Sequence, residues 1–576
     1  MRESVEHYFD GWDGAKLFYR HWPAATKSDK AIVLFHRGHE HSARWQDVIE
    51  KLDMPDAHIF AWDARGHGNS PGERGYAESF SALARDADCF VKHVSQQHMF
   101  AIEDIVVMAH SVGSVIAATW VHDYAPKIRA LVLGSPALRI RLYVPFAIPG
   151  LRVLNKLRPK SFISSYVKGK LLTHDQEKAA SYDNDPLVTR NIAVNVLLGL
   201  HDASSRLLTD AGAITVPTLV LTSGDDWVVR QKMQKEFFNG LSSSKKRMRI
   251  FPGFFHDTFN EKDNHLPIAE ARQFMIEAFE GSYEPANVTD ADKHGYTRLE
   301  YDELSSKIFP LCYKNWGYKL MALGMKTVGR LSDSMRLGWK LGFDSGAMLD
   351  YVYLNKAQGI TPIGKLIDRA HLDSAGWKGI RQRKVHLELA LREVIDNMQA
   401  SQSKVRVLDI ATGQGRYVLD VLQDYPNAQA LLRDYSPINI EAGNKHVAER
   451  GISNVRYEEG NAFDADSVRS ASEADVAIVS GLYELFPDND LLRTSLGALA
   501  AVVPQGGYLI YTNQPWHPQM ELIARVLTSH RDGEPWIMRR RTQQEMDQLV
   551  AQAGFIKEKM AIDDDGIFTV SVARRG

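Results

Sequence analysis

The feature that most constrains the fold of this chain is an alternation of short apolar runs with segments of helical periodicity, which occurs in two separate stretches. In the first stretch the apolar runs lie at residues 31–35, 57–62, 104–109, 130–133 and 218–222. In the second stretch they lie at residues 405–410, 428–433, 475–480 and 507–512. Continuous apolar runs of this length, separated by helices, are typical of parallel strands that are covered on both faces. The pattern therefore predicts two α/β domains in one chain.

A polar segment, GSYEPANVTDAD at residues 281–292, separates the two stretches and indicates a linker. From there to about residue 400 the sequence is compatible with helices and lacks the recurring short apolar runs that indicate strands. We expect three regions: a first domain over residues 1–281 with a cap at about 139–215, a linker and helical region over 282–400, and the core of the second domain over 401–576.

The composition excludes several classes of protein. The 576 residues include 69 Lys and Arg against 71 Asp and Glu, which gives a net charge of −2 and argues against a nucleic-acid partner held by bulk charge. Two cysteines, Cys89 and Cys312, cannot build a disulfide framework or a cysteine-rich zinc site, and we expect no metal site. The N-terminal sequence has no signal pattern and no run of 18 apolar residues occurs, so we expect a cytoplasmic protein.

Ser111 lies between small residues, directly after the apolar run 104–109 and before an apolar helical pattern. Such a sharp strand-to-helix turn exposes a serine hydroxyl at the top of a sheet, beside helix N–H groups that can stabilise an oxyanion. Asp226 and His256 follow later apolar runs, and the order Ser, Asp, His places a catalytic triad along one sheet edge. Asp225 is a competing candidate for the carboxylate.

Six segments in order resemble the monoacylglycerol lipase and lysophospholipase group of α/β-hydrolases. They are HRGHEHSARW (36–45), WDARGHGNSPGERGY (62–76), AHSVGS (109–114), LTHDQEKAASYDNDPLV (172–188), SGDDWVV (223–229) and FPGFFHDTFNE (251–261).

The resemblance covers about residues 5–280 and implies an α/β-hydrolase fold with a helical cap. It implies Ser111 as nucleophile, His256 as general base and acid, and Asp226, at the start of the matching D-x-V-V pattern, as the orienting carboxylate. The backbone N–H groups of Gly38 and Val112 would form the oxyanion hole. The implied substrates are lipids of the monoacylglycerol or lysophospholipid type.

The sequence departs from the family at two positions: the usual His-Gly pair reads His36-Arg37, and the first small residue of the serine turn is Ala109. Alanine is small enough for the turn. For Arg37 two interpretations remain open, since a large side chain here either impairs the oxyanion hole or supplies a cation for an anionic substrate.

Two stretches combine basic and apolar residues. Residues 139–170 contain eight Lys and Arg and no acid, and residues 307–343 contain seven and a single acid, Asp333. Such stretches suit peripheral contact with an anionic membrane, here its inner face, or they are solvated basic surfaces whose apolar side covers a pocket. Besides small-molecule or lipid substrates, an anionic membrane is thus the one partner that we consider, and nucleic acid is not expected.

In the second stretch the apolar run 405–410 leads into a glycine turn that ends at Gly415. Asp434 closes the next predicted strand. Glycines allow a ligand to approach the backbone, and a carboxylate one strand away can accept hydrogen bonds from ribose hydroxyls. By mechanism alone, the pattern fits a dinucleotide or another adenosine-bearing cofactor.

The turn reads D-x-A-x-G-x-G and, with EGNAF (459–463), SGLYEL (480–485) and VPQGGY (503–508), resembles the class I S-adenosylmethionine-dependent methyltransferases, which have a Rossmann-like fold. The resemblance covers about residues 375–576, and the stretch from about residue 301 resembles a methyltransferase family found fused to such hydrolases.

The implied cofactor is S-adenosyl-L-methionine. The positions implied for its binding are Asp409, Ala411, Gly413 and Gly415 at the methionine side, Asp434 at the ribose, and Asn461 and Ala462 at the adenine. The family more often has Asp where Asn461 stands. Tyr483, Glu484 and His517 are candidates for the methyl-acceptor side, although residues at such positions are more often structural.

Together these patterns predict a bifunctional enzyme, a serine ester hydrolase of lipids joined to a methyltransferase whose acceptor is unknown and could be a lipid. The alternative is that one domain is a catalytically silent module that binds a lipid or the cofactor.

Overall fold

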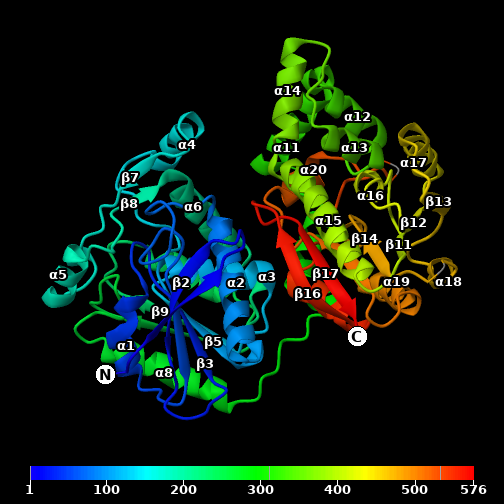
Figure 1. Ribbon diagram of the computed structural model, residues 1–576. Coiled ribbons are helices and arrows are strands. Elements are labelled where there is room, and N and C mark those ends of the chain that lie inside the picture. Colours follow the sequence, from blue (N-terminus) through cyan, green and yellow to red (C-terminus); the bar gives the residue numbers. More distant parts are fainter. Residues whose placement is uncertain (1, 311, 472, 532) are drawn as a thin grey trace. The chain divides into compact units, whose positions relative to one another are not determined.

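The computed structural model describes residues 2–310, 312–471, 473–531 and 533–576. The chain divides into two compact units, Met1–Ala286 and Asn287–Gly576 (Figure 1). Each unit is built around one mainly parallel sheet with helices packed on it, so the predicted fold class is confirmed.

The first unit contains an eight-stranded sheet in the order β1-β2-β4-β3-β5-β6-β9-β10. The strands are β1 Val5–Asp10, β2 Lys16–Trp22, β3 Ala31–Phe35, β4 His58–Trp62, β5 Ile105–His110, β6 Ala130–Gly134, β9 Thr218–Ser223 and β10 Lys246–Phe251. All neighbours from β4 to β10 are parallel, whereas β2 is antiparallel to both β1 and β4. The strands β1, β2 and β10 carry charged residues among the apolar ones and therefore lack the continuous apolar pattern of the predicted runs.

Helices cover this sheet on both faces. The helices α1 (Gln46–Leu52) and α8 (His265–Glu280) share one apolar core with alternate residues of the central strands. The helices α2 (Phe80–His98) and α3 (Val112–Tyr124) pack together. They cover the opposite face of the sheet, where Phe90 of α2 contacts the ring of Phe35 from β3. Between β6 and β9 the chain forms a separate layer of α4 Ala147–Leu157, β7 Phe162–Ser164, α5 Gln176–Asn184, β8 Asn191–Ala193 and α6 Val194–Thr209.

The second unit contains a seven-stranded sheet in the order β13-β12-β11-β14-β15-β17-β16. The strands are β11 Val405–Asp409, β12 Ala428–Asp434, β13 Val455–Glu459, β14 Val476–Val479, β15 Tyr508–Asn513, β16 Phe555–Ile562 and β17 Thr569–Arg575. The first five strands of this order are parallel, and β17 runs antiparallel to β15 and β16. The strand order reverses between β11 and β14, which is where open α/β sheets bind ligands.

Helices also cover both faces of the second sheet. One apolar core joins it to α15 Ala375–Gln399 and α16 Arg416–Leu422, and another joins it to α19 Asn489–Val502 and α21 Gln543–Gln552. The segment before α15 is helical in the residues that the structure describes: α9 Ala291–His294, α10 Tyr296–Ser305, α11 Tyr313–Lys326, α12 Asp333–Leu341, α13 Gly346–Leu354 and α14 Pro362–Leu372.

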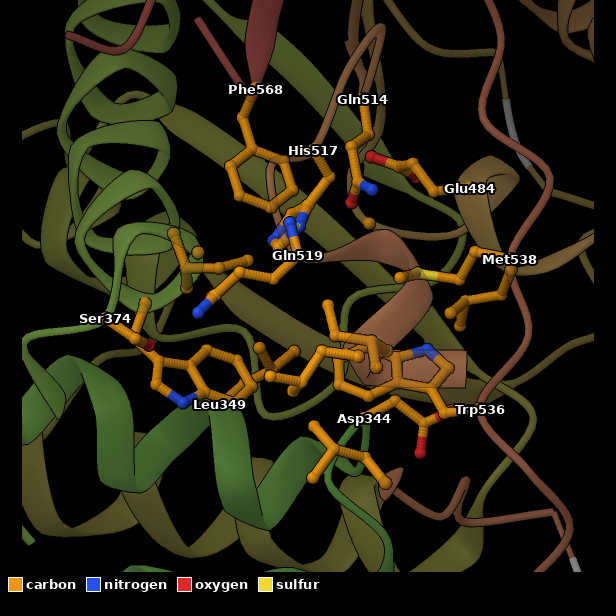
Figure 2. Close-up of a pocket in the computed structure, with 18 of the residues that line it drawn as sticks. Asp344, Leu349, Ser374, Glu484, Gln514, His517, Gln519, Trp536, Met538 and Phe568 are labelled. Atoms are coloured by element: carbon orange, nitrogen blue, oxygen red, sulfur yellow. Dashed lines mark hydrogen bonds between the residues drawn. The ribbon is translucent and has the colours of Figure 1, made fainter. Parts of the chain in front are cut away.

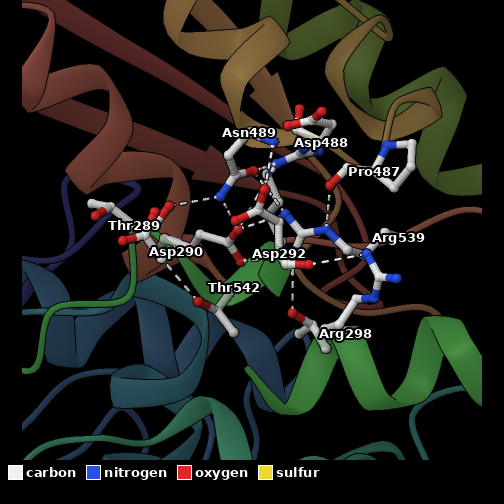
Figure 3. Close-up of polar contacts among 12 residues, drawn as sticks. Thr289, Asp290, Asp292, Arg298, Pro487, Asp488, Asn489, Arg539 and Thr542 are labelled. Carbon is white, nitrogen blue, oxygen red and sulfur yellow. Dashed lines mark hydrogen bonds and ion pairs between the residues drawn. The ribbon is translucent and has the colours of Figure 1, made fainter. Parts of the chain in front are cut away.

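A buried polar network attaches the start of this helical segment to the sheet domain (Figure 3). Asn489 donates from its backbone to the carboxylate of Asp292 (2.9 Å) and from its side chain to the carbonyl of Thr289 (2.9 Å). Arg539 and Arg541 both donate to the side-chain oxygen of Asn489, at 2.7 and 2.8 Å. Burial, and then repulsion by Arg539, lower the pKa of Arg541 to about 9. Residues 289–292 are therefore an integral part of the second unit.

Within the described residues, no helix is both long enough and apolar enough to cross a membrane.

Candidate active sites

The turn between β5 and α3 holds Ser111 in a conformation that side chains rarely adopt, with φ 54° and ψ −113°. This is the strained turn that raises a serine above the carboxyl edge of a sheet. The Ser111 Oγ lies 2.7 Å from Nε2 of His256, and both residues are buried.

The second ring nitrogen of His256, Nδ1, lies 2.7 Å from Oδ2 of Asp226. The other carboxylate oxygen of Asp226 accepts hydrogen bonds from the backbone N–H groups of Val228 (2.7 Å) and Val229 (2.9 Å). Burial raises the pKa of Asp226, but His256 and these two N–H groups outweigh it and leave the pKa below its ordinary value. Asp225, the competing candidate, is exposed, and its backbone N–H donates to the Phe254 carbonyl (2.9 Å). The structure thus brings Ser111, His256 and Asp226 together and leaves Asp225 outside.

The two predicted oxyanion donors face the same pocket as Ser111. Among the described residues, neither the Gly38 nor the Val112 backbone N–H donates to another group of the protein. A side chain at residue 38 would bring its Cβ within 2.9 Å of Cγ2 of Val112, so a glycine is needed for this close approach.

Arg37 does not disturb this arrangement, because its side chain is buried in a paired network. Its guanidinium donates to Glu40 (2.8 Å), lies 3.6 Å from Asp257 and stacks 4.5 Å from the ring centre of Tyr182. Burial alone lowers the pKa of Arg37, but the two carboxylates more than offset it and the pKa is raised. The positive charge of Arg37 is therefore compensated within the protein.

The backbone of Arg37 also orients the oxyanion hole. Nδ1 of His36 donates to the Arg37 carbonyl (2.7 Å), while Nε2 of His36 accepts from the backbone of Ala64 (2.9 Å). In a planar trans peptide the carbonyl and the next N–H point in opposite directions, so this bond fixes the direction of the Gly38 N–H.

A cavity of about 120 Å³ opens from Ser111 and His256 into the cap layer. Its wall is apolar: Leu83, Ile116, Ile140, Leu142, Ile163, Ile192, Val196, Leu197, Leu200 and Val228. A mostly apolar wall with polar groups at one end is typical of a site that binds an acyl chain beside a reactive group.

In the second unit the glycine turn follows β11. Gly413 and Gly415 have positive φ values of 59° and 68°. A Cβ at Gly413 would meet nothing within 4 Å, whereas a Cβ at Gly415 would lie 2.4 Å from the Tyr457 hydroxyl. Gly413 is thus open to a ligand, and Gly415 is required by packing within the protein.

Asp434 stands at the end of β12, beside this turn. Its Oδ2 accepts from the Gly413 N–H (2.8 Å), and its Oδ1 accepts from the Ser436 N–H (2.9 Å) and the Asn439 side chain (3.0 Å). A carboxylate offers about four acceptor positions, so about one remains on Oδ2 for a ribose hydroxyl. These features fit an adenosine-bearing ligand.

The other predicted cofactor residues lie around this turn in different environments. Asp409 is buried beneath it and accepts hydrogen bonds from the Tyr417 hydroxyl and the Ala411 N–H; burial raises the pKa of Asp409 to about 7. Asn461 is exposed after β13 and accepts from the Phe463 N–H (3.0 Å), and Ala462 is buried in the apolar core. Asp409 and Ala462 are therefore buried supports of the glycine turn and its surroundings, whereas Asn461 is exposed.

A second cavity, of about 150 Å³, lies in the second unit (Figure 2). Of the three predicted acceptor-side residues it is lined by Glu484 and His517. Tyr483 lies outside it, because its hydroxyl donates to Ser495 (2.9 Å) inside the core. The cavity is also lined by Gln514, Arg383, Trp377 and Trp536, which were not among the predicted site residues. Only Gln514 carried a signal, since it directly follows a strand at the carboxyl edge of the sheet.

Among the described residues, no group of three or more His, Cys, Asp or Glu side chains is arranged to hold a metal ion.

Comparison with known proteins covers both units. A family model described as "Serine aminopeptidase, S33" matches residues 26–263, and one described as "Putative methyltransferase" matches residues 271–575. The chain is 48% identical over 574 residues to the "Uncharacterized protein YnbC" of Escherichia coli (strain K12), which covers 99% of this chain and 98% of that protein.

The first unit is also similar to a monoacylglycerol lipase of Mycolicibacterium smegmatis, with 25% identity over 273 residues that cover 47% of this chain and 96% of the lipase. Among solved structures, the Paleococcus ferrophilus monoacylglycerol lipase aligns with 48% of this chain and 99% of its own, at 24% identity and a TM-score of 0.41. The predicted fusion is confirmed: the chain belongs to this methyltransferase family and carries an S33-type α/β-hydrolase domain ahead of the methyltransferase domain.

Proposed function

We propose that the first unit hydrolyses carboxylic esters of the monoacylglycerol or lysophospholipid type. The proposal rests on two side-chain hydrogen bonds at the end of an apolar cavity. One joins Ser111 to His256 and the other joins His256 to Asp226, both at 2.7 Å.

In this mechanism Ser111 Oγ attacks the ester carbonyl while Nε2 of His256 takes its proton. Asp226 holds the histidine ring by Nδ1–H and stabilises its positive charge. The N–H groups of Gly38 and Val112 stabilise the oxyanion. His256 then gives its proton to the leaving alcohol, and water hydrolyses the acyl-enzyme by the same steps in reverse order.

The substrate class follows from the wall of the cavity and from Arg37. The apolar wall suits the part of an acyl chain next to the ester, since about 120 Å³ holds only a group of about the size of benzene. The charge of Arg37 is already paired with Glu40 and Asp257, so the residue adds no cation for an anionic head group. The relative named above is a monoacylglycerol lipase, which supports a neutral glycerol ester.

The test is the release of fatty acid from monoacylglycerol and from lysophosphatidylcholine by the full chain. We expect turnover with the wild type and none above background with Ser111→Ala. The matched control is Ser114→Ala, one helical turn further on, whose hydroxyl donates to the Gly134 carbonyl (3.2 Å). Equal rates for wild type and Ser111→Ala would refute the proposal.

For the second unit we propose methyl transfer that depends on S-adenosylmethionine. The match to a methyltransferase family and the fit of the glycine turn support it. The cofactor supplies an electrophilic methyl group on a sulfonium. Gly413 would allow its close approach to the backbone, Asp434 would accept a ribose hydroxyl, and Asn461 and Ala462 would border the adenine.

Calorimetric titration of the full chain with S-adenosylmethionine tests this assignment. We expect Asp434→Ala to weaken binding by about 10- to 100-fold, since it removes a charged hydrogen bond worth about 1.5–3 kcal/mol. Asp424→Ala, an exposed acid paired with Arg392 (2.8 Å), is the matched control and should bind like the wild type. Failure of the wild type to bind would refute the cofactor assignment.

Two further measurements on the full chain, the binding of a monoacylglycerol and the transfer of a labelled methyl group, decide the alternative in which one unit is a silent binding module. A first unit that binds a monoacylglycerol without turnover, or a second unit that binds the cofactor without transferring its methyl group, would establish that alternative for the unit concerned.

We further propose that the cap touches an anionic membrane peripherally. In α4 and the loop before it Phe146 is 86% exposed and Leu157 75% exposed, and Arg152, Lys156 and Arg158 lie beside them. Exposed apolar side chains flanked by cations are typical of interfacial segments. In a flotation assay we expect binding to vesicles that contain phosphatidylglycerol, reduced by Phe146→Ser; equal recovery with and without anionic lipid would refute the contact.

A further inference from the structure

The cavity of about 150 Å³ in the second unit lies at the carboxyl edge of its sheet, where β14 and β15 end. Glu484 follows β14, and Gln514 and His517 follow β15. The neighbouring strand of β14 is β11, which leads into the glycine turn. Ligands of open α/β sheets bind at this edge, beside the reversal of strand order.

The walls of the cavity are mainly apolar and aromatic. The rings of Trp377 and Trp536 lie nearly parallel with centres 6.3 Å apart, and Phe568, Leu349 and Met538 complete the wall (Figure 2). An apolar cavity of about 150 Å³ holds a molecule about the size of benzene. The part of a ligand that enters is therefore an apolar group of that size.

Four buried polar atoms in this wall have no partner among the described residues: Nε of Arg383, Nε1 of Trp536, Oε2 of Glu484 and Nε2 of Gln514. The last two, an acceptor and a donor, belong to the side chains that follow β14 and β15. The side chains are only 6% and 3% exposed, and Figure 2 shows both on the same side of the cavity. Buried polar atoms without a partner are rare, because their lost hydration is not replaced. A ligand that presents both a hydrogen-bond donor and an acceptor at this point would satisfy them, and a hydroxyl group does both.

The charges around the cavity favour a neutral ligand. Oε1 of Glu484 accepts from the Thr512 hydroxyl (3.0 Å) and lies 3.7 Å from Arg383, so these two charges compensate each other. Asp344 accepts hydrogen bonds from the Ser529 hydroxyl (2.6 Å) and the His530 backbone N–H (2.5 Å). A carboxylate ligand would have to share Arg383 with Glu484.

His517 is not suited to accept a proton here. Its Nδ1 already accepts a hydrogen bond from the Gln519 backbone (3.0 Å), and burial lowers the pKa of His517 to about 4. The ring is thus neutral with its proton on Nε2, which makes that nitrogen a donor. Glu484 Oε2 is left as the proton acceptor.

We propose that this cavity binds the methyl acceptor, which is a neutral apolar molecule carrying a hydroxyl on a group about the size of a benzene ring. The inference rests on the methyl transfer proposed above. Gln514 Nε2 donates to the hydroxyl oxygen, and Glu484 Oε2 takes the hydroxyl proton. As that O–H bond breaks, the oxygen forms a bond to the methyl carbon, and the electron pair of the carbon–sulfur bond leaves on the sulfur of the donor.

The binding test uses the full chain saturated with S-adenosylmethionine and titrates phenol, benzyl alcohol and benzoate by calorimetry. We expect the two hydroxylated rings to bind and benzoate to bind at least about 10-fold more weakly. Leu349→Trp, which fills the cavity, should abolish binding of the rings while the affinity for the cofactor stays within twofold. Absence of ring binding in a wild type that binds the cofactor, or benzoate binding as tightly as phenol, would overturn the proposal; absence of cofactor binding would instead refute the proposed function.

The chemical test follows labelled methyl transfer from S-adenosylmethionine to the rings that bind. General-base catalysis contributes about 10²- to 10⁴-fold, so we expect Glu484→Gln to lose at least about 100-fold in rate while its affinity for the cofactor is unchanged. Glu521→Gln, an acid of α20 (Met520–Val526) outside the cavity, is the matched control. Wild-type transfer rates in Glu484→Gln, or ring binding without any transfer by the wild type, would overturn the role of Glu484.

Discussion

The two cavities are both apolar, but their polar groups differ in how they are paired. In the hydrolase unit His256 hydrogen-bonds both Ser111 and Asp226, so these three side chains pair with one another. Among the described residues, Glu484, Gln514, Arg383 and Trp536 each keep a buried atom without a hydrogen-bond partner at the methyltransferase cavity, whereas Arg37 alone does so at the hydrolase cavity. The difference fits the proposals that the first unit carries its own nucleophile and that a ligand completes the cavity wall of the second unit.

The largest effect expected from this comparison concerns the carboxylate of the first site. Asp226→Asn should lower ester turnover by about 10⁴-fold, because an amide at this position stabilises the wrong tautomer of the histidine. The matched change Asp225→Asn, on the exposed neighbour, should leave turnover within about twofold. Steady-state rates on a monoacylglycerol measure both, and equal losses in the two variants would refute the assigned roles.

The next effect concerns the buried arginine of the first unit. Arg37→Met leaves Asp257 without its cation and Glu40 with Arg44 alone (2.6 Å), and losing one partner of a buried ion pair costs about 3–5 kcal/mol. We expect a large fall in the denaturant midpoint of the hydrolase unit and no change in the transition of the methyltransferase unit. If Arg37→Met were stable and instead discriminated against anionic substrates, Arg37 would be a substrate residue after all.

A pH effect is expected from two buried histidines of the first unit. In the first unit His21 and His98 lie beside each other (ring centres 4.8 Å apart), and burial lowers the pKa of His21 to about 3 and that of His98 to about 4. Because the unfolded chain binds protons near pH 6.5 and the folded unit only below these values, stability should fall as the pH drops from about 6.5 toward 4. His21→Phe, which keeps the stack on Phe60 (4.3 Å), should flatten this dependence in thermal unfolding; an unchanged slope would contradict it.

The smallest effects distinguish the two glycines of the cofactor turn. Gly413→Ala meets no neighbour, so it should cost only about 1–2 kcal/mol for its left-handed conformation and act mainly on cofactor affinity. Gly415→Ala meets Tyr457 at 2.4 Å and should cost about 1–3 kcal/mol more through overpacking. Unfolding and calorimetry on both variants test this, and equal losses of stability would show that Gly413 also packs against the protein.

Much of the fold was predictable because apolar runs at strand length mark the central strands of both sheets. Ser111, Asp226 and His256 could be proposed for the same reason, since each follows such a strand and the chain order fits one sheet edge. Strands with charged residues, such as β1 and β10, could not be identified from apolar runs.

The surroundings of the sites depended on contacts between distant residues. The role of Arg37 could not be decided from the sequence, because its partners lie far away in the chain. Asp257 neutralises its charge, and the ring of Tyr182 stacks on its guanidinium. The cavity of the second unit brings together α13, α15 and the segment after β15, and no local pattern predicts that Trp377 and Trp536 meet.

The most direct test of this contrast is labelling of the full chain with a fluorophosphonate, followed by peptide mass spectrometry. We expect one adduct, on the peptide that contains Ser111, formed without S-adenosylmethionine and absent from Ser111→Ala. An unlabelled wild type, or an adduct that persists in Ser111→Ala, would contradict the conclusion that the first unit carries its own complete nucleophilic site.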